Sequence, residues 1–92
     1  MLERKVRIDR TRKLRDDFGK SSVHEGEQGV IIDDKNIDTY TFKNEYDRKM
    51  CRSLIDKAKQ ICPHENYQKH LEVILLEKKF PAIVPVEHFD SL

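Results

Sequence analysis

The stretch from Asn44 to Cys62 constrains the fold most, because its side chains separate onto two halves of a helix. At 100° per residue its apolar side chains share one half of the helical wheel, and the other half holds Lys49, Arg52, Asp56, Lys59 and Gln60. Asn44 suits the N-cap position, and Pro63 lacks the N–H that a continuing helix needs. We therefore predict a surface helix over 44–62 with one buried face.

A second helix is predicted over residues 64–79. One apolar stripe repeats at the spacing i, i+4, i+7, i+8, namely Tyr67, Leu71, Ile74 and Leu75. The other apolar side chains fall nearly opposite it, namely Val73, Leu76 and Phe80. A helix with two apolar faces needs two packing partners, so it is either the central helix of the domain or its second face meets another chain.

Residues 29–43 predict a β-hairpin. The β-branched run Val30-Ile31-Ile32 precedes the turn-forming stretch 33–36, and residues 37–43 alternate around threonine and aromatic side chains. Two β-prone runs joined by a short Asp- and Asn-rich turn are typical of a hairpin.

The C-terminal residues 80–92 predict an extended segment, because Pro81 and Pro85 exclude a helix. Its apolar content is high for a free tail, so it either packs on its own domain or awaits a partner. Together with the second face of the 64–79 helix it supplies the predicted partner-binding residues, which are Val73, Leu76, Phe80, Ile83, Val84, Val86 and Phe89.

The first twenty residues hold eight basic and four acidic side chains, whereas the rest of the chain is weakly acidic. Val6 and Ile8 alternate with charges as in a short edge strand, yet a helical stripe also fits, and helix is favoured over 11–18. Such a basic segment attracts phosphates, although its acids lie four residues from several of the bases, where helical side chains pair. The nucleic-acid alternative rests on Arg4, Lys5, Arg7, Arg10, Arg12, Lys13, Arg15, Arg48, Arg52 and Lys59.

Metal binding and catalysis find little support. The four possible zinc ligands, Cys51, Cys62, His64 and His70, lack the close cysteine pair of zinc sites. A metal-dependent nuclease would need residues 73–79 to be a strand ending in Glu77-x-Lys79, with Asp33 or Asp34 sharing the ion. The helical periodicity of that segment argues against this reading.

These features predict an α+β fold: a small single domain with a β-hairpin, then two amphipathic helices and an extended C-terminal segment. Residues 1–20 form a basic N-terminal segment and 21–92 the domain, with 80–92 as its apolar tail. Charged residues are 38% of the chain, and no apolar run could span a bilayer. We expect a non-enzymatic regulatory or adaptor protein, cytoplasmic and without a cofactor or metal. It would act by protein–protein contact and self-associate, with nucleic-acid binding as the alternative.

Overall fold

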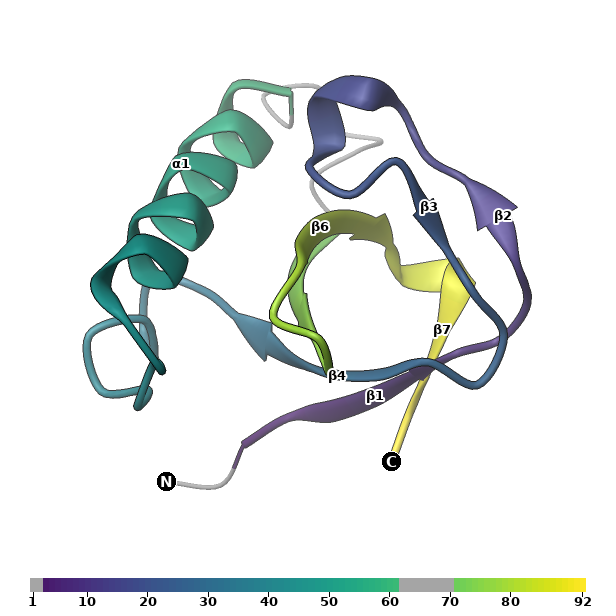
Figure 1. Ribbon diagram of the computed structural model, residues 1–92. Coiled ribbons are helices and arrows are strands. Elements are labelled where there is room, and N and C mark those ends of the chain that lie inside the picture. The colour runs from purple at the N-terminus through teal and green to yellow at the C-terminus, as the bar shows by residue number, and fades with distance from the viewer. Residues whose placement is uncertain (1–2, 62–70) are drawn as a thin grey trace.

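The computed structural model describes residues 3–61 and 71–92, which form a curled antiparallel sheet with a helix along one side (Figure 1). The five-stranded sheet has the order β6-β5-β4-β1-β7. Its strands are β1 (Lys5–Ile8), β4 (Gln28–Ile32), β5 (Leu71–Leu76), β6 (Pro81–Pro85) and β7 (Phe89–Ser91). A small hairpin of β2 (Arg12–Lys13) and β3 (Ser22–Val23) lies beside it, and the helix is α1 (Glu45–Ile61). Two 3-10 turns, η1 (Asp16–Phe18) and η2 (Val86–His88), complete the described elements.

The predicted second helix is wrong where the structure describes it, because residues 71–76 form β5. This strand pairs with β4 on one side and β6 on the other. Leu71, Val73 and Leu75 face a core beneath α1, whereas Ile74 and Leu76 face a second core inside the curl. Both faces of the strand are buried, so the alternation that marks a half-exposed strand is missing. The strand therefore divides these residues differently from the predicted helix, which had grouped Ile74 with Leu71 and Leu75, and Val73 with Leu76.

The predicted hairpin over 29–43 is wrong, although its first strand and its turn do form. The turn forms, because Asp33 Oδ1 accepts the N–H groups of Lys35 and Asn36, while Asn36 Oδ1 accepts the N–H of Asp33. The chain then continues in turns instead of a second strand, and the Tyr40 N–H bonds to the Asn36 carbonyl. β4 finds its partners in β1 and β5, which lie far away along the sequence.

The helix predicted from Asn44 is confirmed over Glu45–Ile61, and Cys62 lies outside the described residues. Asn44 Oδ1 accepts the Asp47 N–H at 2.9 Å, which caps the first turn as predicted. The buried face of α1 carries Cys51, Leu54 and Ile55. It packs on β5 and β6, so it covers the outer core.

The N-terminal segment joins the main sheet, with β1 lying between β4 and β7. Val6 and Ile8 both point into the inner core, as the strand interpretation predicted. The helix favoured over 11–18 is wrong, because this stretch contains β2 and η1. The chain then turns at Gly19, whose φ is +93° and where a Cβ would lie 2.5 Å from the Pro81 carbonyl oxygen.

The C-terminal segment is extended in β6 and β7, with the 3-10 turn η2 between them, and it packs on its own domain. β6 pairs with β5, and β7 pairs with β1 after the η2 turn. Ile83 and Val84 are fully buried, on opposite faces of β6. Among the described helices, none has the length and hydropathy to cross a membrane.

Candidate functional site

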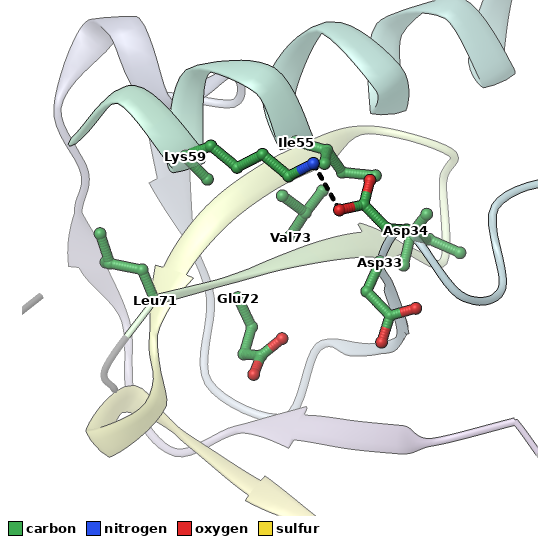
Figure 2. A pocket seen from close by; sticks show the side chains of 9 residues that line it. Asp33, Asp34, Ile55, Lys59, Leu71, Glu72 and Val73 are labelled. Carbon is green, nitrogen blue, oxygen red and sulfur yellow. Dashed lines mark ion pairs between the residues drawn. The ribbon is translucent and has the colours of Figure 1, made fainter. Parts of the chain in front are cut away.

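A cleft of about 450 Å³ lies between the C-terminal half of α1 and the ends of β4 and β5 (Figure 2). Its volume falls within the range of small-ligand sites, roughly 300–1,000 Å³. The end of β4 and the start of β5 lie side by side at the cleft, so the segment that connects these two strands leaves the sheet and rejoins it at neighbouring positions. Nine residues line the cleft, namely Ile32, Asp33, Asp34, Ile55, Ala58, Lys59, Leu71, Glu72 and Val73.

The floor of the cleft is apolar. Ile55 and Ala58 are three residues apart on α1 and so share one face of it. Leu71 and Val73 rise from β5 toward the helix, because alternate residues of a strand share a face (Figure 2). This surface suits an apolar side chain from a ligand or partner.

Two carboxylates lie on the other side of the strands. Asp33 and Glu72 point away from α1 in Figure 2, and they follow the Ile32–Val73 pair in the ladder. Arg4 reaches both of them, at 3.7 Å from Asp33 and 3.8 Å from Glu72. Burial raises the pKa of Glu72; the charge of Arg4 opposes this rise, and that of Asp33 adds to it.

A third carboxylate, Asp34, is engaged by α1. It forms ion pairs with Lys59 and, at 3.3 Å, with Arg52. The hydrogen bond from Lys59 lowers the pKa of Asp34, so this side chain is ionised in neutral solution. Lys59 is therefore already paired, whereas within residues 3–61 and 71–92 the ion pairs of Asp33 and Glu72 are the long contacts to Arg4.

Two kinds of reactive group were sought near the cleft, a thiolate and a set of metal ligands. Cys51 lies on α1 one turn before Ile55 and does not line the cleft, and burial raises the pKa of its thiol to about 12, which disfavours the reactive thiolate at neutral pH. Among residues 3–61 and 71–92, no three His, Cys, Asp or Glu side chains are grouped to hold a metal ion. Of the suggested zinc ligands, Cys62, His64 and His70 lie outside these ranges.

The predicted partner-binding residues separate into two groups. Val73, Leu76, Ile83 and Val84 are core residues of this chain, with at most 4% of each side chain exposed. Phe80 and Val86 are exposed, and Phe89 is half-buried beside the inner core. Only this second group offers a surface to another molecule.

The predicted nucleic-acid residues also separate. Arg48, Arg52 and Lys59 form ion pairs with acids of α1 and of the preceding turns, namely Glu45, Asp34 and Asp38. In the N-terminal region Arg4, Arg12 and Arg15 are also paired with acids. The remaining four make no ion pair with another described residue, namely Lys5, Arg7, Arg10 and Lys13.

The suggested nuclease residues are not brought together. Residues 71–76 do form a strand, but β4 and β5 are antiparallel. Asp33 therefore lies at the start of β5, while Glu77 lies past its end, where its N–H bonds to the Gln28 carbonyl. At about 3.3 Å per residue, the two acids are roughly 16 Å apart along the strand.

Sequence reasoning did not single out Glu72, one of the three carboxylates that line the cleft. The available signal was its position as the one charged residue in the run Leu71–Leu76. Comparisons of this chain with protein-family models, with curated proteins and with solved structures found no match.

Proposed function

We propose that this protein is a non-enzymatic regulatory or adaptor protein that binds another protein through the cleft between α1, β4 and β5. The observation that carries the proposal is the composition of the cleft, which has an apolar floor beside two carboxylates that share a single arginine. Apolar contacts with a few placed polar groups are the usual chemistry of a binding site.

Site-specific photocrosslinking in the native host would test this proposal. A photoreactive amino acid at Lys59, on the rim of the cleft, should capture a protein. The same amino acid at Lys49, on α1 but outside the cleft lining, should not. Ala58→Gln should reduce the adduct because it fills the cleft, whereas Ser53→Gln on the exposed side of α1 should leave it intact. Equal adducts from both positions would remove the proposal.

Nucleic-acid binding is a second candidate, supported by the four exposed cations that make no ion pair with another described residue. Lys5 and Arg7 lie on β1, Arg10 in the turn that follows and Lys13 on β2. A gel shift at low salt should lose its signal in the variant with all four changed to glutamine, and it should keep its signal when Arg48, Arg52 and Lys59 are changed instead. Binding through phosphates would weaken steeply as salt rises. No shift at low salt would end this candidate.

The cytoplasm is the location we propose. The support is the Cys51 thiol, which lies unpaired in the core, as is usual for proteins of reducing compartments. Immunofluorescence or cell fractionation of the protein in its host would test this, and recovery from an oxidising compartment would contradict it.

A further inference from the structure

We infer that the cleft accepts an extended segment of a partner protein in which a basic side chain directly adjoins an apolar one. This inference rests on the proposed function and names the chemistry of the partner. Its basis is the arrangement of two unlike surfaces on opposite sides of the same strand ends.

The apolar surface lies on the α1 side of the strand ends. Ile55 of α1 faces Leu71 and Val73 of β5 across the cleft. Ala58, one turn further along α1, also lines the cleft and packs on the same core. A leucine or isoleucine side chain placed here would bury apolar area against all four, and such burial is favourable at about 25 cal/mol per Å².

The acidic surface lies on the opposite side. Asp33 and Glu72 point away from α1, and their only ion pairs within the described residues are to Arg4, at 3.7 and 3.8 Å. These separations are too long for hydrogen bonds. The Arg4 side chain is also 58% exposed, so it is free to move aside. A guanidinium or ammonium group from a partner can therefore replace Arg4 and form the short, charge-assisted bonds that Arg4 does not.

An extended backbone connects the two surfaces in a natural way. Successive side chains of a strand point to opposite sides, so neighbouring residues reach opposite faces of whatever they cross. A segment that runs past the ends of β4 and β5 would place an apolar side chain beneath α1. Its adjacent basic side chain would then lie beside Asp33 and Glu72. A helical segment, whose neighbouring side chains differ by only 100°, fits this division less well.

A library of short random peptides, selected on the full chain, would test the inference. A peptide is assigned to the cleft when Ala58→Gln weakens its binding and Ser53→Gln does not. Such peptides should carry arginine or lysine next to leucine, isoleucine or phenylalanine. Glu72→Gln should weaken the binding of these peptides roughly tenfold. Replacing arginine by citrulline in the peptide should have the same effect, because citrulline keeps the shape of arginine and loses its charge.

Arg4→Ala provides the sharpest outcome. If Arg4 competes with the partner for the two carboxylates, this change should tighten peptide binding several-fold, because it frees both carboxylates and removes a cation that repels the basic side chain of the peptide. Cleft-bound peptides without a basic residue, or insensitivity to Glu72→Gln, would overturn the inference and leave the proposed function standing. A selection that yields no peptide weakened by Ala58→Gln would count against the proposed function itself.

Discussion

Asp33, the residue after β4, lies one step beyond the Ile32–Val73 pair, as does Glu72 of the neighbouring antiparallel strand β5. Like charges at such positions destabilise a sheet, and Arg4 compensates only at distances of 3.7 and 3.8 Å. Asp33 has a structural task as well, since its carboxylate accepts two backbone N–H groups of the turn that follows β4. Glu72 makes no such hydrogen bonds to the turn, so the fold does not need the charge of its side chain.

Glu72→Gln should therefore stabilise the protein at neutral pH, by up to about 1 kcal/mol. The pKa of Glu72 is raised in the fold, chiefly by burial, so the folded chain holds this proton more tightly than the unfolded chain does. The free energy of unfolding then falls as pH rises between the unfolded and the folded pKa. The gain from Glu72→Gln should be full above this window and absent below it. Urea denaturation across acidic to neutral pH measures this, and a loss of stability at neutral pH would contradict it.

Glu27→Gln should act in the opposite direction. Burial alone would raise the pKa of Glu27, but hydrogen bonds from Lys20 Nζ at 2.7 Å and from the His24 N–H outweigh it, so the pKa is lowered. The carboxylate then contributes stability above its unfolded pKa, and this contribution is lost as pH falls through the folded pKa. We expect Glu27→Gln to cost about 1–2 kcal/mol at neutral pH and less in acid. Glu25→Gln, at an exposed neighbour, should change little at either pH.

Lys79→Gly should stabilise the β5–β6 turn. Lys79 has a φ of +64°, the left-handed conformation that glycine adopts without a steric penalty. The side chain of Lys79 makes only a weak contact that would be lost, since its Nζ lies 3.5 Å from the Tyr40 hydroxyl. We expect a gain of roughly 0.5–1 kcal/mol in thermal or urea denaturation. Lys78→Gly, one residue earlier and not at positive φ, should instead cost stability, and equal effects at the two positions would refute the interpretation.

Self-association, where it occurs, should respond to Phe80 and not to Leu76. Phe80 is 51% exposed, so Phe80→Glu should leave the fold intact and dissociate an oligomer that uses this surface. Leu76 is 1% exposed in the inner core, so Leu76→Glu should unfold the chain by burying a charge. Sedimentation with circular dichroism separates these effects. A monomeric parent protein would end the proposal of a homo-oligomer.

Cys51 should resist thiol reagents while the protein is folded. Its side chain is fully buried, and burial together with the charge of Asp47 raises its pKa to about 12. A Cys62→Ser variant isolates its signal, and we expect reaction only after denaturant is added. Rapid reaction of the native variant would show that this part of the core opens readily.

The helix was predictable because its signals are local. The apolar face of α1 and the Asn44 cap both lie within one stretch of sequence, and the structure reproduces both. The sheet was not predictable in the same way, because β4 pairs with β1 and β5, and these partners are set by contacts between distant segments. β5 was predicted as a helix for a further reason. Both of its faces are buried, so its sequence lacks the alternation of apolar and polar residues by which a strand is recognised.

The candidate site was partly visible in the sequence. Asp33 and Lys59 were both noted, each for a different suggested function. Their association with Glu72 in one cleft depends on the register between β4 and β5. The same applies to the basic residues, because the sequence does not show that Arg48 and Arg52 share Asp38 as an ion-pair partner.

The departure of the chain from the sheet at Ile32 and its return at Val73 affect how the molecule folds. This connection is roughly ten times as long as the turn between β5 and β6, so closing it costs about 2 kcal/mol more in chain entropy. The packing of α1 on β5 and β6 must offset that cost. The insertion cannot simply be replaced by a short loop, because its removal would uncover Val73, Leu75 and Ile83. An apolar sheet face of this kind, once open to solvent, would promote aggregation. The inserted helix therefore stabilises the very strands whose pairing it makes entropically costly.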